Sequence, residues 1–160
     1  MTLKGYRLVK ARHAATAFDG AGARRFGGRW NSPGVLVSYA SGSVSLAILE
    51  VLVHLDAAAL LSAYSLCPVE FDEPLVEWVE AAALPRGWRD YPAPPELRAL
   101  GDAWAESGRS AVLQVPSAIV PDESNYLLNP VHADFSRIRL KPPEPFRWDP
   151  RIGGPKAPAR

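Results

Sequence analysis

The sequence predicts one compact domain that combines several β-strands with two helices, and three observations support this. A chain of 160 residues is long enough to bury a single hydrophobic core. No internal repeat or change in composition divides it, so we expect residues 1–152 to form one domain and residues 153–160 a flexible C-terminal tail. Strand-like segments bounded by turn residues lie on both sides of two segments with helical patterns.

The composition is that of an ordinary globular protein, with 48% hydrophobic residues, 22% charged residues and a net charge of +1. The longest apolar stretch, residues 44–55, is too short to span a bilayer, and the first residues lack the apolar segment of a signal peptide. We therefore expect a cytoplasmic protein that has no contact with membranes.

Metal and disulfide chemistry are not expected from this sequence. Cys67 is the single cysteine, so no intrachain disulfide and no cluster of thiolate ligands can form. The three histidines lack the spacing of a metal site. We predict no metal and interpret Cys67 as a buried structural thiol.

The clearest local unit is a strand, a turn and a helix in the first third of the chain. Residues 35–39 have a strand pattern, and the turn at residues 41–43 supplies hydroxyl groups that can cap a helix over residues 43–55. A second, amphipathic helix is predicted over residues 95–106, with a proline in its first turn and Gly108 near its end.

The remaining segments are shorter strands and proline- or glycine-rich loops. We expect residues 72–74 to connect two strands as a hairpin, with Pro68 weakening the first strand or placing it at a sheet edge. The other predicted strands are residues 5–9, 64–71, 75–79, 111–116 and 137–140. The predicted loops are residues 18–34, 84–95 and 117–130.

Glu50 is the strongest candidate for a functional residue. It lies within the apolar run of residues 43–55, where an unpaired buried carboxylate would cost several kcal/mol. At 100° per residue, Ser43, Ala47, Glu50 and His54 form one narrow polar stripe on the predicted helix. The stripe either faces water, with His54 at its exposed end, or lines a cleft.

Arg29 is preceded by two glycines and followed by Trp30. This pattern is compatible with a tight turn in which the arginine stacks on the tryptophan. It is equally compatible with an arginine that binds a phosphate while the bare glycine backbone allows close approach. The segment matches neither the dinucleotide fingerprint nor the phosphate loop that ends in Lys-Ser/Thr.

Tyr39 and Ser117 each have a structural and a functional interpretation. Tyr39 is either a core residue whose hydroxyl is satisfied by backbone, or a side chain that reaches the same cleft as Glu50. Ser117, which follows Pro116, either orders a turn or hydrogen-bonds a ligand. No Gly-x-Ser-x-Gly elbow is present, so a serine hydrolase is excluded.

Six motifs occur in an order that resembles the RES domain family, over residues 5–149. These motifs are Tyr6-Arg7, Gly28-Arg29-Trp30-Asn31, Tyr39-Ala40-Ser41, Ala47-Ile48-Leu49-Glu50, Val115-Pro116-Ser117 and Asn125-Tyr126-Leu127-Leu128-Asn129-Pro130.

The resemblance implies an α+β fold with mixed or antiparallel sheets flanked by helices, similar to ADP-ribosyltransferases and diphtheria-type toxins. It also implies a toxin of a bacterial type II toxin–antitoxin pair, held inactive by an Xre-type antitoxin that covers the active site. NAD would be the substrate, and no cofactor would be needed. The toxin would cleave the nicotinamide–ribose bond as a glycohydrolase or, with phosphate as acceptor, as a phosphorylase.

The same resemblance assigns roles to six residues. Glu50, Arg29 and Tyr39 would be catalytic, and Arg7, Ser117 and Asn125 would bind NAD. A fixed carboxylate suits this chemistry, because positive charge develops at the ribose C1 as nicotinamide leaves.

Three other functions use some of the same residues. A protein ADP-ribosyltransferase would share the site and differ only in the acceptor. A non-catalytic nucleic-acid-binding module would use Arg24, Arg25, Arg29 and Trp30, but a net charge of +1 argues against direct nucleic-acid binding. A glycosidase lacks a second carboxylate placed by sequence next to Glu50.

Overall fold

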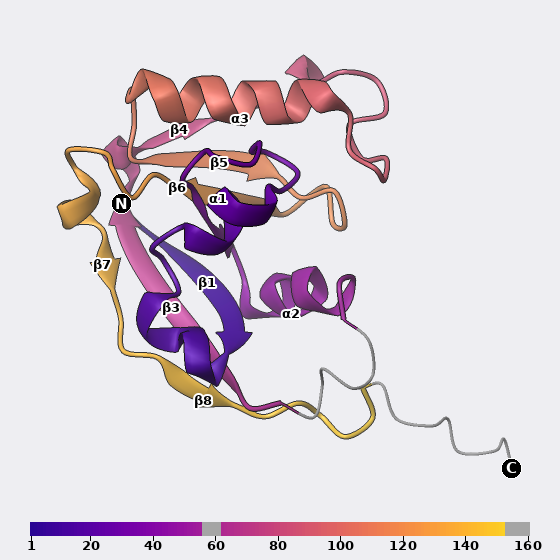
Figure 1. Ribbon diagram of the computed structural model, residues 1–160, viewed down its shortest axis with the longest axis vertical. Helices are drawn as coiled ribbons and strands as arrows, with labels where there is room; N and C mark the ends of the chain where they lie inside the picture. The colour runs from indigo at the N-terminus through magenta and orange to yellow at the C-terminus, as the bar shows by residue number, and fades with distance from the viewer. Residues whose placement is uncertain (56–61, 153–160) are drawn as a thin grey trace, which may run out of the picture.

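The computed structural model describes residues 1–55 and 62–152. In this part of the chain, one eight-stranded sheet has the order β4-β5-β6-β2-β1-β3-β7, and β8 pairs separately with β3 (Figure 1). The strands are β1 (Thr2–Lys10), β2 (Ser38–Ser41), β3 (Tyr64–Asp72), β4 (Val76–Trp78), β5 (Val112–Pro116), β6 (Ser124–Leu128), β7 (Arg139–Leu140) and β8 (Glu144–Phe146). The α-helices are α1 (Ala21–Phe26), α2 (Val44–Leu52) and α3 (Pro95–Ser107). Short 3-10 turns are η1 (Ala11–Thr16), η3 (Glu73–Leu75), η4 (Ala81–Ala83) and η5 (Phe135–Arg137).

The sheet is mixed, which confirms the predicted α+β fold. β4 and β5 pair in parallel, whereas the other strand pairs described are antiparallel. β1 and β3 form the longest pair, in register from Thr2 opposite Asp72 to Lys10 opposite Tyr64. β2 connects this pair to β6, so the short strand Ser38–Ser41 lies in the middle of the sheet.

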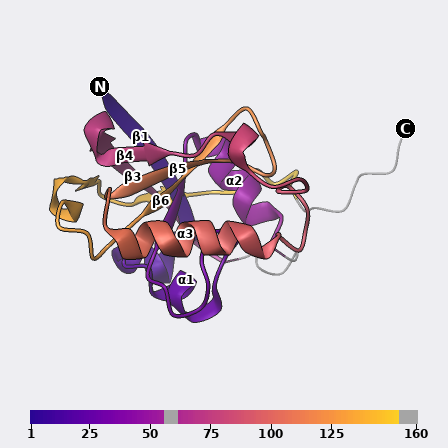
Figure 2. The same cartoon turned by 90° about the horizontal axis from the view of Figure 1, so that it is seen from above.

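Alternating side chains on the strands form separate cores on the two faces of the sheet. On β6, Tyr126 and Leu128 belong to one core cluster and Leu127 to another, as expected for a strand buried on both faces. The cluster of Leu127 includes Leu97 and Trp104 of α3, which lies across that face (Figure 2).

A third, smaller cluster holds α2 against the sheet. Ala47 of α2 is buried with Leu8 and Tyr64, and Phe146 and Trp148 from the C-terminal segment pack against them. The Trp148 ring meets Tyr64 and Phe146 edge-on, with ring centroids 5.1 Å apart in both pairs. The end of the described chain thus helps to fix the helix that carries Glu50.

The predicted strand–cap–helix unit is present, with shifted boundaries. Ser43 caps α2, because its Oγ accepts a hydrogen bond from the Leu46 amide at 3.1 Å. The strand begins at Ser38 rather than at residue 35. The helix ends at Leu52 rather than at residue 55. Just after it, the His54 amide donates to the Val51 carbonyl at 3.0 Å, and this 3-10-type hydrogen bond closes the last turn.

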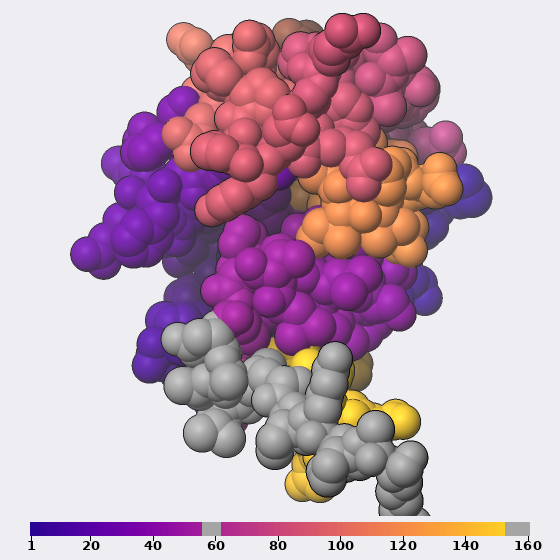
Figure 3. All heavy atoms as spheres, turned by 90° about the vertical axis from the view of Figure 1, so that its right-hand side faces the viewer, coloured from indigo at the N-terminus to yellow at the C-terminus, as the bar shows by residue number. Residues whose placement is uncertain are grey.

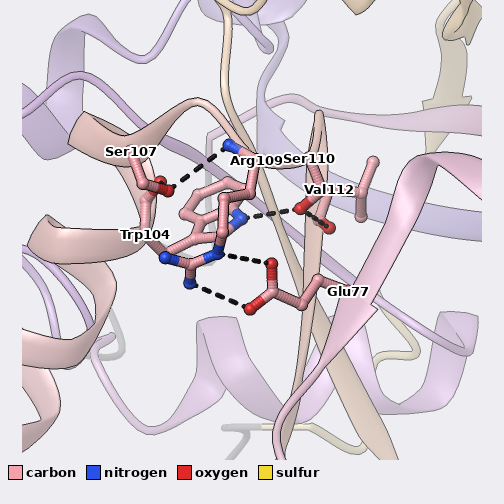
Figure 4. Close-up of polar contacts among 6 residues, drawn as sticks. All are labelled: Glu77, Trp104, Ser107, Arg109, Ser110 and Val112. Atoms are coloured by element: carbon pink, nitrogen blue, oxygen red, sulfur yellow. Dashed lines mark hydrogen bonds and ion pairs between the residues drawn. The ribbon is translucent and has the colours of Figure 1, made fainter.

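Side chains beyond α3 attach the end of this helix to the sheet. Gly108 ends α3 with a φ of 61°, a left-handed conformation that favours glycine. Trp104 Nε1 donates to Ser110 Oγ at 2.8 Å, and Arg109 forms an ion pair with Glu77 of β4 at 2.9 Å (Figure 4). The observed helix α3, Pro95–Ser107, is one residue longer at its C-terminal end than the predicted helix, residues 95–106.

The predicted hairpin between β3 and β4 is wrong. The chain turns through η3 and β4 leaves β3 to pair in parallel with β5, with Val76 opposite Val112. Leu75, Val76 and Val112 are buried in the same core cluster, so tertiary burial determines the pairing. Pro68 was expected to weaken β3 or to place it at a sheet edge. β3 is an interior strand, and Pro68 lies between the residues of β3 that pair with β8 and those that pair with β7.

Several short elements differ from the sequence prediction. Residues 117–130 were predicted as a loop but include β6. This strand was missed because its first residues, Ser124 and Asn125, are polar. The glycine-rich segment, residues 18–34, contains α1, which is bounded by Gly20 and Gly27 at φ values of 77° and 72°. The late strand is reduced to β7 after η5, and β8 was not predicted. The predicted tail, residues 153–160, lies outside the described residues.

Candidate functional site

A cleft of about 1050 Å³ lies where segments far apart in the sequence meet. Its walls come from β1 and the glycine-rich segment, from β2 and α2, from the proline-rich loop (residues 84–95) with the start of α3, and from the segment around Ala118 and Asn125. Figure 3 views the face of the molecule where these segments come together.

Three of the four residues of the predicted polar stripe line this cleft. Ala47, Glu50 and His54 border it, as the cleft-lining interpretation predicted. The fourth, Ser43, caps α2 and does not line the cleft. The apolar side of the helix is less buried than predicted, since Leu49 and Val53 are 38% and 58% exposed.

Glu50 is held in a defined position by a neighbouring strand. Its Oε1 accepts a hydrogen bond from Asn125 Nδ2 at 2.6 Å and a longer one from Ser117 Oγ at 3.4 Å. Asn125 reaches it because β6 pairs with β2, where Asn125 lies opposite Ser41 at the edge of the cleft. In the described part of the chain these contacts involve Oε1, which leaves Oε2 free to face a ligand.

Ser117 was expected at the substrate, but the structure places it behind Glu50. Its side chain is fully buried and does not line the cleft. Its Oγ accepts hydrogen bonds from the amides of Ile119 and Val120, both at 3.1 Å. Ser117 therefore orders its own turn and supports the carboxylate.

The glycine-rich loop is organised around Asn31, which is fully buried. Asn31 Nδ2 donates to the Ala23 carbonyl at 2.9 Å, and the Gly28 amide donates to the Asn31 carbonyl at 2.9 Å. A side chain at Gly28 would press on the Tyr39 hydroxyl, with a Cβ only 2.8 Å away, so the bare backbone is required here. The loop is a packed structure whose outer residue, Arg29, borders the cleft.

Arg29 is anchored to the proline-rich loop rather than stacked on Trp30. Its Nη1 donates to the carbonyls of Trp88 and Asp90 at 2.9 and 3.1 Å. Trp30 is 2% exposed and belongs to the core. It cannot stack on a base, so the arginine–tryptophan surface considered for nucleic-acid binding is not formed.

Tyr39 combines its two predicted roles. Its hydroxyl donates to Asn31 Oδ1 at 2.7 Å and accepts from the Trp30 amide at 3.2 Å, while the residue borders the cleft. Burial raises the pKa of the Tyr39 phenol above its usual value. The phenol thus stays protonated and works as a rigid part of the wall.

This pKa gives a testable pH dependence. A tyrosine in the unfolded chain ionises near pH 10, whereas folded Tyr39 keeps its proton. The unfolded state then binds fewer protons, so the free energy of unfolding falls above about pH 10, by up to about 1.4 kcal/mol per pH unit. Tyr39→Phe should flatten this fall in urea titrations at high pH. An unchanged slope would contradict the burial of the phenol.

Arg7 borders the cleft from β1 and carries unused hydrogen-bonding capacity. Its Nη1 donates to the Tyr39 carbonyl at 2.8 Å. Its Nε is buried and has no partner among the described residues. Burial lowers the pKa of the Arg7 guanidinium, which reflects the cost of keeping this cation away from water.

Two cleft arginines were not predicted from the sequence, Arg89 on the proline-rich loop and Arg98 on α3. Arg89 follows Trp88 in the loop predicted over residues 84–95, and an aromatic residue is typical of an ordered loop rather than a flexible linker. This was the one available signal. Arg98 resembles any solvated residue on an amphipathic helix. With Arg7 and Arg29, the described walls contain four arginines and one carboxylate, Glu50.

Two further features of the described residues concern metal ligands and membrane-spanning helices. No group of three or more His, Cys, Asp or Glu side chains there could hold a metal ion. Within residues 1–55 and 62–152, no helix has the length and apolar character needed to cross a membrane. Cys67 is buried, and burial raises the pKa of its thiol.

The fold and the cleft define an α+β domain in which one glutamate and four arginines, among the described residues, line the same cleft. Residues 4–149 match the RES domain, and the chain belongs to this family, as the motifs predicted. A protein named Toxin Res from Yersinia enterocolitica is 40% identical over 148 residues, which cover 92% of this chain and 97% of that protein. A protein named Prs ADP-ribosylating toxin from Sphingobium sp. is 39% identical over 157 residues, covering 95% and 98% of the two chains.

A solved structure supports the fold independently. The M. tuberculosis MbcT–MbcA toxin–antitoxin complex contains a chain that superposes with a TM-score of 0.75 at 23% identity, covering 92% of this chain and 85% of that one.

Proposed function

We propose that the protein is the toxin of a toxin–antitoxin pair and that it consumes NAD by breaking the bond between nicotinamide and ribose. The observation that carries this proposal is Glu50, fixed by Asn125 in a cleft that also contains Arg7 and Arg29. Membership of the RES domain family and the toxin names of its relatives support it.

In this proposal Glu50 stabilises the positive charge that develops at the ribose C1 as nicotinamide leaves. The hydrogen bonds from Asn125 and Ser117 hold one carboxylate oxygen, so the other can face the ribose without reorganisation. A carboxylate that is already oriented is more effective than one that must be ordered during the reaction.

Arg7 and Arg29 would bind the diphosphate of NAD. The buried Nε of Arg7 lacks a protein partner in the described structure, and a phosphate oxygen would supply one. Arg29 is held by two backbone carbonyls and has no carboxylate partner among the described residues. The ring of Tyr39 would pack against nicotinamide or ribose, and Asn125 and Ser117 would act by positioning Glu50.

A protein ADP-ribosyltransferase is the second candidate, favoured by the name of the Sphingobium relative. The bond that breaks is the same in both reactions, and the difference is whether water, phosphate or a protein side chain attacks C1. The cleft opens to the surface (Figure 3), and this opening favours none of these acceptors over the others.

Product analysis distinguishes these reactions. The purified protein is incubated with labelled NAD, with and without inorganic phosphate, and separately with a cell lysate. Free ADP-ribose would indicate hydrolysis, and ADP-ribose 1''-phosphate would indicate phosphorolysis. Label on a protein would indicate transfer to that protein. Intact NAD under all three conditions would refute the proposed function.

We further propose that an Xre-type antitoxin neutralises the protein by covering the cleft. Three apolar side chains at its border are exposed, namely Phe26 at 72%, Val53 at 58% and Tyr91 at 85%. Exposed apolar groups around a polar cavity are typical of a surface that binds another protein. Added antitoxin should suppress NAD loss in the same assay.

A further inference from the structure

Eight of the arginines that the structure describes fall into two groups with different partners. Four surface arginines form ion pairs with carboxylates, namely Arg109, Arg137, Arg139 and Arg151. The four cleft arginines instead donate to backbone carbonyls, and none of them has a carboxylate partner in the described part of the chain.

A carbonyl partner orients a guanidinium group without neutralising its charge. Arg98 Nε donates to the Gly28 carbonyl at 2.9 Å, and Arg89 Nε donates to the Ala118 carbonyl at 3.0 Å. In both residues the protein contact uses Nε, so the two terminal nitrogens are left to donate. Guanidinium N–H groups in this arrangement can bind two oxygens of one phosphate.

The two residues lie along one wall of the cleft. Gly28, which anchors Arg98, precedes Arg29 in the chain, and Trp88 and Asp90, which anchor Arg29, flank Arg89. Ala118, which anchors Arg89, follows Ser117, the residue that supports Glu50. A series of arginine–carbonyl bonds thus connects α3, both loops and the support of the carboxylate.

The cleft contains more positive charge than the proposed substrate requires. A diphosphate has two negative charges at neutral pH, which Arg7 and Arg29 would balance. Arg89 and Arg98 then remain in a partly enclosed cleft, and among its described wall residues Glu50 is the one carboxylate. Unneutralised cations in such a site repel one another and favour the entry of a further anion.

We propose that Arg89 and Arg98 form a phosphate-binding subsite beside Glu50. The phosphate group is either part of the dinucleotide or a separate inorganic phosphate, and both present the same oxygens to the arginines. The identity of the dinucleotide rests on the proposed function, whereas the subsite itself rests on the two arginines.

The test measures affinity directly, by calorimetry. NAD is titrated into Glu50→Gln, which should not consume it, and into the same protein carrying Arg89→Gln or Arg98→Gln. Inorganic phosphate and pyrophosphate are titrated into the wild type and into the two single variants. Arg109→Gln is the matched control, because it removes a surface arginine that is already paired with Glu77.

Each subsite variant should weaken the binding of at least one of these ligands by about 10- to 100-fold, as expected for the loss of a charge-assisted contact. It should also reduce the salt dependence of binding, which a purely structural change would leave intact. If the two variants bind only NAD more weakly, the subsite binds a phosphate of the dinucleotide. If they bind inorganic phosphate more weakly, the subsite binds a separate phosphate.

The proposal is overturned if both variants bind all three ligands as the Arg109→Gln control does, or if the parent proteins bind none of them. A protein that leaves NAD intact but binds phosphate through Arg89 and Arg98 would refute the proposed function and retain the subsite.

Discussion

Glu50→Gln is expected to reduce NAD cleavage by about 100- to 1,000-fold, the usual cost of losing a preorganised charged group. Glutamine has nearly the same shape, and its amide oxygen can still accept the hydrogen bond from Asn125. It is neutral, so it cannot stabilise the positive charge at the ribose C1. The fold should be unaffected, because Glu50 is half-buried at the cleft and outside the hydrophobic clusters.

Glu77→Gln is the matched control for this substitution. Glu77 lies on β4 and forms an ion pair with Arg109 (Figure 4). Neither residue lines the cleft. The Glu77→Gln variant should cleave NAD at the wild-type rate. Both variants should unfold at nearly the same temperature as the wild type. Full NAD consumption by Glu50→Gln would remove the carboxylate from the mechanism.

Local signals in the sequence were sufficient to find the elements that carry much of the cleft. The serine that caps α2 and the proline and glycine that bound α3 act within a few residues of themselves. The pairing of β4 with β5 could not be found in this way. It depends on the burial of Leu75 and Val76 against strands that are distant in sequence.

The same distinction explains which cleft residues were found. Glu50 was visible because a carboxylate in an apolar run is unusual, and Arg29 because glycines flank it. Arg89 and Arg98 have ordinary neighbours, and they are recognised only when their carbonyl partners are seen. Ser117 was found from its motif, but its position behind the carboxylate required the fold.

Gly101→Ala is expected to cause the largest loss of stability. Alanine in the middle of a helix is normally favoured over glycine by up to about 1 kcal/mol. Here a Cβ at position 101 would overlap the backbone carbonyl of Trp30, which cannot rotate away as a side chain could. We expect a destabilisation of about 3 kcal/mol, because either α3 or the glycine-rich loop must shift.

The shift would also reach the cleft, since Trp30 follows Arg29 and Arg98 of α3 is bonded to Gly28. NAD cleavage should therefore fall even under conditions where the variant remains folded.

Gly22→Ala is the control for stability. It lies in α1, and a Cβ there would meet nothing within 4 Å, so it should stabilise the protein by about 0.5 kcal/mol. Urea unfolding measures both variants. Wild-type stability in Gly101→Ala would show that α3 can move away from Trp30 without loss of packing, and that the close contact does not hold the loop.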